Sequence, residues 1–295
     1  MHACGHDCHT AMLLGAARVL KDNESEINGT IKLIFQPAEE GGAGGKMMRD
    51  QGVLEDPDVE QIFGLHVSDK LPTGTLASKE GTLLAATSSI KILVSGNGGH
   101  AAMPHLTSDP VVTGSKIVVE LQTLISRELD PLESGVISIT MANAGSATNV
   151  IPSSMELQGT IRSLTSEGIS RLQQRVIEVA EGIAIANRCT AEVTFPGNDF
   201  PPTVNDGECW ELGKISAGEI LGEESVSEMG SIMGGEDFSY YTQVVPGCFS
   251  FLGVGNPEIG AVFGVHHPKF KVDEDALSLG TAIHVNTALN ALRSL

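Results

Sequence analysis

Residues 1–10 read Met1-His2-Ala3-Cys4-Gly5-His6-Asp7-Cys8-His9-Thr10, and they place three histidines, two cysteines and an aspartate ahead of an apolar segment. Packing alone does not require so many polar donors in one short stretch. Imidazole nitrogen and thiolate sulfur are ligands for borderline metals such as zinc. The stretch therefore predicts part of a metal site, although His9 taken alone is better explained as a residue of a helix start. The possible donors are His2, Cys4, His6 and His9, with Asp7 as a group that orients a ligating histidine.

The size and charge of the chain restrict its class of partner. Its 295 residues are enough for a large hydrophobic core and for two domains. The net charge of −19, from 37 acidic and 18 basic residues, argues against nucleic acid and anionic membranes, because both bind positive protein surfaces. We expect a small molecule or a protein as the partner. No apolar run is long enough to span a bilayer, and five scattered cysteines do not indicate a disulfide framework, so we expect a reducing, cytoplasmic compartment.

Helical and strand patterns alternate after the donor stretch. Apolar residues at helical spacing predict a helix that Thr10 caps and that ends near residue 21. Residues 30–35 alternate apolar and polar side chains, which predicts a strand. A short helix over 45–50 and a second strand over 61–67 follow. Strand, helix and strand in succession are typical of an α/β sheet.

Polar residues with possible chemistry lie at the ends of both predicted strands. Glu39 and Glu40 follow the first strand on a glycine-flexible loop, where adjacent carboxylates point in different directions. One carboxylate could then bind a metal while the other faces the reacting water, and a solvated acidic pair is the alternative. His66 ends the second strand, where a structural histidine is the alternative.

The pattern changes near residue 87 and returns to α/β alternation near residue 200. Six predicted elements in between run β, α, β, β, α, β, which is the ferredoxin-like arrangement. Asp109-Pro110 marks the start of the first of these helices, with a capping aspartate and a proline at the first helical position. We therefore expect one domain over residues 1–86 and 200–295, and a second domain over 87–199 inserted into it.

Three residues of the inserted domain are candidates for substrate contacts. His100 follows two glycines in a glycine-rich loop, where an exposed turn residue is the alternative. Asn149 could be only a turn former, and Arg162 only a surface charge on its strand. A histidine pair, His266-His267, lies on a loop ahead of the C-terminal helix.

Seven short motifs occur in a fixed order along the chain, and together they carry a resemblance. The chain resembles the amidohydrolase branch of the aminoacylase and carboxypeptidase G metallopeptidases, which includes hippurate hydrolases, N-acetyldiaminopimelate deacetylases and indole-acetyl-amino-acid hydrolases. The resemblance covers essentially the whole chain. The motifs are Met1-His2-Ala3-Cys4-Gly5-His6-Asp7, Gln36-Pro37-Ala38-Glu39-Glu40, Gly64-Leu65-His66, Gly98-Gly99-His100-Ala101-Ala102, Asn149-Val150-Ile151-Pro152, Gly235-Glu236-Asp237-Phe238 and His266-His267-Pro268.

This resemblance implies a fold, a cofactor and a reaction. It implies an α/β catalytic domain of the metallopeptidase type, with an inserted ferredoxin-like lid domain that often also dimerises. It implies hydrolysis of the amide bond of N-acyl-amino acids, of the N-acetyl, N-benzoyl or indole-acetyl type. Two divalent metal ions would take part, Mn²⁺ or Zn²⁺ first, with Co²⁺ or Ni²⁺ as alternatives. By position in the motifs, the metal ligands would be Cys4, His6, Glu40, His66 and His266.

The same resemblance assigns the remaining roles. Glu39 would be the general base, which accepts a proton from water and returns it to the leaving amine. His100, from the lid of the same or another subunit, would stabilise the oxyanion. Asn149 and Arg162 would hold the α-carboxylate of the amino acid, which suits the planar fork of arginine.

The chain departs from the family pattern in two respects, and three other functions are alternatives to amide hydrolysis. Family members carry further strands and a helix before the first motif, so we expect a fragment of a longer product, with poorer solubility or activity than an extended form. Cys8 stands where alanine is commoner, and we expect that change to be neutral. The rivals are a cysteine-nucleophile hydrolase that uses Cys4 with His6, a non-catalytic binding protein descended from the enzyme, and a metallo-dipeptidase.

Overall fold

The computed structural model describes residues 1–197 and 199–294 and divides the chain into two compact units. Unit 1 comprises Met1–Leu83, Thr203–Ile232 and Asp237–Leu295. Unit 2 comprises Leu84–Pro202 and Met233–Glu236. The second unit is therefore an insertion that also includes four residues from the later part of the chain.

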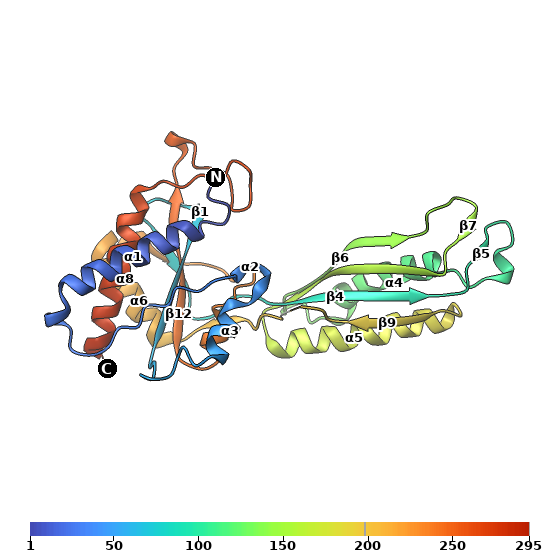
Figure 1. Ribbon diagram of the computed structural model, residues 1–295, viewed down its shortest axis with the longest axis horizontal. Helices are drawn as coiled ribbons and strands as arrows, with labels where there is room; N and C mark the ends of the chain where they lie inside the picture. The colour runs from blue at the N-terminus through green and yellow to red at the C-terminus, as the bar shows by residue number, and fades with distance from the viewer. Residues whose placement is uncertain (198, 295) are drawn as a thin grey trace. The chain divides into compact units, whose positions relative to one another are not determined.

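Unit 1 is built on a four-stranded sheet in the order β1-β12-β2-β11 (Figure 1). Strand β1 runs parallel to β12, and β2 runs antiparallel to β12 and parallel to β11. A separate two-stranded sheet pairs β3 with β10. The strands are β1 (Ile62–Pro72), β2 (Leu76–Ser78), β3 (Gly81–Leu84), β10 (Thr203–Asn205), β11 (Val226–Glu228) and β12 (Gly247–Gly255).

Three long helices pack together in unit 1 and share one hydrophobic core with the sheet. They are α1 (His6–Asp22), α6 (Gly207–Leu221) and α8 (Asp275–Ser294). Met12 and Trp210 are fully buried in this core. The shorter helical segments are α2 (Glu39–Gly42), α3 (Gly44–Asp50), α7 (Ser239–Thr242), and 3₁₀ turns at Glu24–Glu26, Glu223–Ser225 and Pro257–Ile259.

The start of α1 corrects one prediction. The helix begins at His6, four residues before the expected cap at Thr10, so the donor stretch continues into the helix itself. Gly5 precedes the helix with a left-handed φ of 93°, and the Thr10 hydroxyl donates to the His6 carbonyl inside the first turn. The apolar spacing could not reveal this because the first turn consists of polar residues.

Two predicted features of the strands are also wrong. Residues 30–35 form no strand, because they take part in none of the hydrogen-bonded ladders of the described residues. The strand that carries His66 does not end there but continues to Pro72, so His66 lies in the middle of β1. Parallel pairing with β12, which sets His66 opposite Phe251, extends the strand beyond its apolar run.

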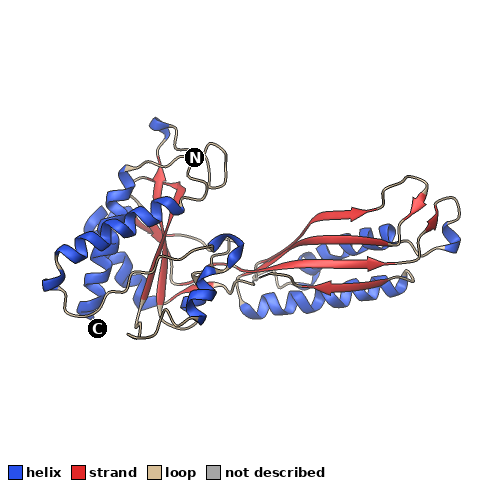
Figure 2. Cartoon of the chain, in the orientation of Figure 1, coloured by secondary structure: helices blue, strands red, loops and turns tan. Residues whose placement is uncertain are grey.

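Unit 2 has the ferredoxin-like arrangement that the sequence predicts. Its four-stranded antiparallel sheet has the order β6-β8-β4-β9, and both long helices pack against it to enclose a second core (Figure 2). The Asp109 carboxylate caps its first helix by accepting from the backbone N–H groups of Val111 and Val112. In chain order these elements are β4 (Ala86–Ser95), α4 (Pro110–Thr123), a π-helical turn (Leu124–Glu128), β6 (Gly135–Ala144), β8 (Ser154–Ser163), α5 (Ser166–Ala186) and β9 (Thr190–Thr194).

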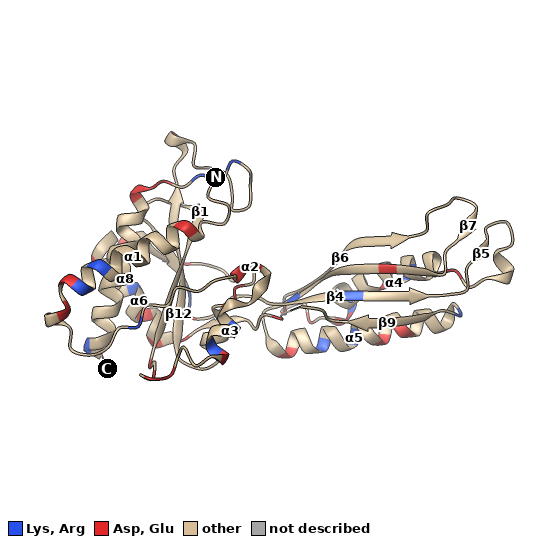
Figure 3. Cartoon of the chain, in the orientation of Figure 1, with Lys and Arg blue, Asp and Glu red and all other residues tan. Residues whose placement is uncertain are grey.

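A small strand pair and a mixed-charge helix surface complete unit 2. Strands β5 (Gly99–His100) and β7 (Val150–Ile151) pair with each other, and a 3₁₀ turn follows at Pro104–Leu106. Helix α5 carries both acidic and basic residues, and Arg175 pairs with Glu178 on it (Figure 3). Such exposed pairs contribute little stability. Within the described residues, no helix combines the length and the apolarity that a bilayer span requires.

Candidate metal centre

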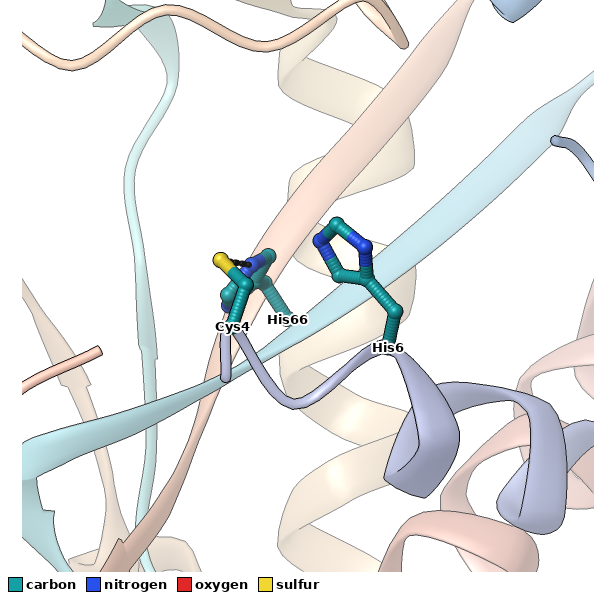
Figure 4. A group of neighbouring side chains, drawn as sticks. All are labelled: Cys4, His6 and His66. Carbon is teal, nitrogen blue, oxygen red and sulfur yellow. Dashed lines mark hydrogen bonds between the residues drawn. The ribbon is translucent and has the colours of Figure 1, made fainter. Parts of the chain in front are cut away.

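Four groups of three potential metal ligands lie among the described residues of unit 1, and two of them share the Cys4 thiol. One group consists of Cys4, His6 and His66 (Figure 4), and the other of Cys4, Glu40 and His266. Within each group the ligand atoms all lie within 4.8 Å of one another. The structure thus brings together all five residues that the sequence proposes as ligands, although they come from four separate segments. A shared thiol between two groups is the arrangement that one bridging ligand and two cations require.

The backbone around Cys4 explains why the segment presents its side chains inward. Gly5 adopts a φ of 93°, and a Cβ atom at this position would lie 2.4 Å from Cγ2 of Val67, so only glycine fits without a shift. The Gly5 N–H donates to the His2 carbonyl at 2.8 Å and closes a tight turn around Cys4. The His266 N–H donates to the Ala3 carbonyl at 2.8 Å, which ties the loop before α8 to the same turn.

The hydrogen bonds of His66 leave one ring nitrogen available. Its Nδ1 donates to the Val67 carbonyl at 2.8 Å, so Nε2 carries the free lone pair, and this atom lies 3.6 Å from the Cys4 sulfur (Figure 4). Burial lowers the pKa of His66 to about 4, so the ring is neutral at physiological pH. A neutral imidazole that is oriented through its other nitrogen is the form that binds a metal.

His2 and His9, the other two histidines of the donor stretch, lie outside both groups that contain Cys4. His9 Nε2 accepts the Val67 N–H at 3.0 Å, and the His9 ring contacts the His66 ring with centroids 4.4 Å apart. Burial, together with the neighbouring His66, lowers the pKa of His9 to about 2. His9 therefore supports β1 and the His66 ring. His2 instead pairs with Asp7, whose carboxylate lies 2.7 Å from its Nδ1, so Asp7 does not orient any of the five ligands.

The two adjacent carboxylates face different histidines. Glu40 Oε2 lies 3.7 Å from His266 Nδ1, whereas Glu39 Oε2 lies 3.8 Å from His6 Nε2. Burial raises the pKa of Glu39 to about 7, with further contributions from the charges of Asp237 and Glu40. A carboxyl group that titrates near neutrality can both accept and release a proton.

Asp237 is a functional residue to which the sequence reasoning assigned no role. It is fully buried, and its two oxygens accept from the Gln36 side chain at 2.6 Å and from the Gly45 N–H at 2.8 Å. These two contacts hold both ends of the loop that carries Glu39 and Glu40. The Gly235-Glu236-Asp237-Phe238 motif was the available signal, but nothing in its residues indicated the partner loop.

His266 and His267, the adjacent histidines on the loop before α8, lie in different environments. His266 has a left-handed φ of 64° and joins the second ligand group. The His267 ring stacks on Phe263 with centroids 4.5 Å apart, and its Nδ1 accepts the Lys269 N–H at 3.0 Å. The structure therefore brings His266, and not His267, to the candidate centre.

The donor set fits the two cations that the sequence implies. It offers one buried thiol, three imidazole rings and one carboxylate, and these are the donor types that zinc and neighbouring divalent transition metals accept. The Nε2 of His66 accepts a long hydrogen bond, of 3.6 Å, from the shared thiol, and a bound cation would take the place of that proton.

Two of the three substrate-binding candidates lie together in unit 2. The Asn149 carbonyl accepts the Ala101 N–H at 3.0 Å, next to the β5–β7 pair in which His100 stands opposite Val150. His100 Nδ1 accepts the Ala102 N–H at 3.1 Å, so the neutral ring carries its proton on the exposed Nε2. This nitrogen can donate a hydrogen bond to an oxyanion.

Arg162 lies far from that pair within the same unit. It stands on β8 opposite Thr87, eight residues from the Ser154 end at which the β5–β7 pair begins. At the ordinary rise of a strand, this separation is roughly 26 Å. One guanidinium nitrogen donates to the Met233 carbonyl at 2.7 Å, and burial lowers the pKa of Arg162. Arg162 and Asn149 of one chain therefore cannot hold the same carboxylate.

Known proteins are similar to this chain over nearly all of its length. The model of peptidase family M20/M25/M40 matches residues 1–290. IAA-amino acid hydrolase ILR1-like 4 of Arabidopsis thaliana is 45% identical, over 100% of the chain and 67% of that protein. N-acetylcysteine deacetylase of Bacillus subtilis is 38% identical, over 100% of the chain and 75% of that protein. A solved Bacillus subtilis structure, described as a dinuclear metal-binding M20 peptidase, has a TM-score of 0.84 and 34% identity, over 100% of the chain and 74% of that structure.

Proposed function

This chain belongs to the M20/M25/M40 family of peptidases, and from that membership we propose that it is a dinuclear-metal amidohydrolase that cleaves N-acyl-amino acids. The products would be a carboxylate and a free amino acid. The observation that carries the proposal is the pair of ligand groups that share Cys4, with Glu39 beside them. The N-acetyl, N-benzoyl and indole-acetyl amino acids are the substrate class.

Five residues would hold the cations. Cys4, His6 and His66 would hold one, and Cys4, Glu40 and His266 the other, with Mn²⁺ or Zn²⁺ as the first candidates and Co²⁺ or Ni²⁺ as alternatives. Two bound cations would polarise the amide carbonyl and make a water molecule easier to deprotonate.

Glu39 would move the proton. Its carboxylate is half-buried and lies beside His6, so it is close to the ligands without belonging to either group that contains Cys4. It would accept a proton from the attacking water and deliver it to the nitrogen of the departing amine, thereby acting first as a base and then as an acid. Asp237 would keep the loop of Glu39 in place.

The inserted unit would act as a lid and a dimerisation domain. His100, through its Nε2–H, would donate to the oxyanion, and Arg162 and Asn149 would bind the substrate carboxylate. Because Arg162 lies roughly 26 Å from the β5–β7 end of its own sheet, one substrate would meet Arg162 of one chain and the His100–Asn149 pair of a second copy. A homodimer follows from this division. The five free thiols support the cytoplasm as the compartment.

Metal analysis combined with an amide-cleavage assay tests the proposal. The purified chain should contain at least two divalent cations and release amino acid from N-acetyl, N-benzoyl or indole-acetyl substrates, and a chelator should abolish the release. Faster cleavage of dipeptides would favour a metallo-dipeptidase. Activity that survives the chelator would favour a cysteine nucleophile, and metal binding without turnover on any substrate would favour a non-catalytic binding protein.

A further inference from the structure

A third group of potential ligands lies in unit 1 and shares no residue with the candidate metal centre. It consists of His2, Asp7 and Cys8, whose ligand atoms all lie within 4.8 Å of one another. His2 Nδ1 lies 2.7 Å from Asp7 Oδ2 and 3.7 Å from the Cys8 sulfur. Neither the proposed hydrolysis nor the resemblance uses this group.

The geometry of α1 keeps the third group apart from the first two. Successive residues of an α-helix are rotated by about 100° around its axis. Cys8 therefore points some 200° away from His6, into the core that α1 shares with α6 and α8. The turn closed by the Gly5 N–H and the His2 carbonyl folds His2 back over this part of the helix, where its ring meets the edge of Phe270.

The distance between the nitrogen and sulfur donors matches a tetrahedral cation site. Metal bonds of about 2.1 Å to nitrogen and about 2.3 Å to sulfur, at the tetrahedral angle, place the two atoms about 3.6 Å apart. The observed separation of His2 Nδ1 and Cys8 Sγ is 3.7 Å. The Asp7 oxygen would have to withdraw from 2.7 Å to about 3.3 Å, and its side chain is 60% exposed and therefore free to do so.

The surroundings favour a cation at this position. The Cys8 side chain is only 3% exposed, whereas the His2 side chain is 24% exposed, so the group has a buried soft donor and an entrance from solvent. The Asp7 carboxylate, whose Oδ2 lies 2.7 Å from His2 Nδ1, places negative charge at the group. Three protein donors leave a fourth position for water, as in open zinc sites.

We propose that His2, Asp7 and Cys8 form a separate binding site for one divalent, thiophilic cation of the zinc type. The substitution of cysteine at position 8 is then not neutral, because this residue supplies the sulfur donor. The site would take up a third equivalent of metal independently of the two that the proposed function requires.

Titration of the metal-free full chain with Cd²⁺ tests this proposal, because cadmium bound to a thiolate produces an ultraviolet charge-transfer band. The wild-type chain should bind three equivalents. C8A and H2A should each bind two equivalents. In C8A the charge-transfer band should also be weaker by the absorbance that one thiolate contributes. The His2 side chain is partly exposed, so we expect H2A to fold and to test the site even if C8A does not fold. As a control, C209A removes a fully buried thiol from another helix and should still bind three equivalents.

Two results would overturn the proposal: saturation of the wild-type chain at two equivalents, or three equivalents in both C8A and H2A. C4A separates this proposal from the proposed function. It should lose cations of the dinuclear centre and keep the Cys8-dependent equivalent. A failure of the proposed centre would instead leave only that equivalent in the wild-type chain, and C8A would remove it.

Discussion

Glu39 is the single residue on which the proposed proton transfer depends. Its neighbour Glu40 faces His266, while Glu39 faces His6 from a half-buried position. We expect Glu39→Gln to reduce turnover roughly a hundredfold or more, because an amide cannot accept the proton of the attacking water. Metal content should stay equal to that of the wild-type chain, as elemental analysis would reveal. Glu60→Gln, an exposed carboxylate in the same unit, serves as the control. An active Glu39→Gln enzyme would remove Glu39 from this role.

His284 connects the stability of unit 1 to pH. Burial in α8 lowers its pKa to about 4 from an ordinary value of 6.5. As the pH falls from 6.5 to 4, His284 is protonated in the unfolded chain but stays neutral in the folded chain. This difference lowers the free energy of unfolding by up to roughly 3 kcal/mol. Above pH 6.5 both states are neutral and the residue contributes no pH dependence.

We therefore expect His284→Gln to flatten the decline of stability between pH 6.5 and pH 4. Urea unfolding of the metal-free chain at several pH values measures this slope. His105→Gln, at an exposed site of unit 2, should leave it unchanged. Equal slopes for the wild-type chain and His284→Gln would mean that this ring is protonated without cost in the folded state.

Among the secondary-structure elements, the turn before α1 is the one that sets the metal ligands in place. Gly5 combines a φ of 93° with a missing Cβ that would lie 2.4 Å from Val67. We expect Gly5→Ala to cost about 1–3 kcal/mol of stability and to lower the metal content, because the turn that presents Cys4 must open. Thermal unfolding and metal analysis measure the two effects. Gly182→Ala places a methyl group in open space inside α5, so it should not lower the stability and should leave the metal content unchanged.

At the scale of the whole molecule, the proposed division of substrate contacts between two copies leads to a complementation test. His100→Ala and Arg162→Ala should each be nearly inactive. A mixed dimer would contain one site with an intact Arg162 from one chain and an intact His100 from the other. Random exchange of equal amounts produces half mixed dimers, each with one working site, so about a quarter of the wild-type activity should return.

Subunit exchange followed by the amide-cleavage assay measures this recovery. As a control, a mixture of His100→Ala with the double variant that carries both changes in one chain should stay inactive, because no site could then receive an intact His100. Absence of recovery in the first mixture, with exchange verified by mass, would assign both contacts to a single chain.

Local sequence was sufficient for much of this protein. Periodicity and capping predicted the helices of unit 2 and its β, α, β, β, α, β order, since Asp109-Pro110 and the apolar spacing act over a few residues. The donor types in the motifs predicted metal chemistry for the same reason, because ligand preference belongs to the side chain itself.

Only the tertiary structure decided how distant segments meet. Residues 30–35 join no hydrogen-bonded ladder and therefore form no strand, and local sequence does not determine which segments pair. Pairing with β12 extends β1 past His66. The tertiary structure brought Asp237 to the loop of Glu39, moved Arg162 away from Asn149, and gathered His2, Asp7 and Cys8 on their own side of α1. These relations depend on distances in space, which residue types and their spacing along the chain do not determine.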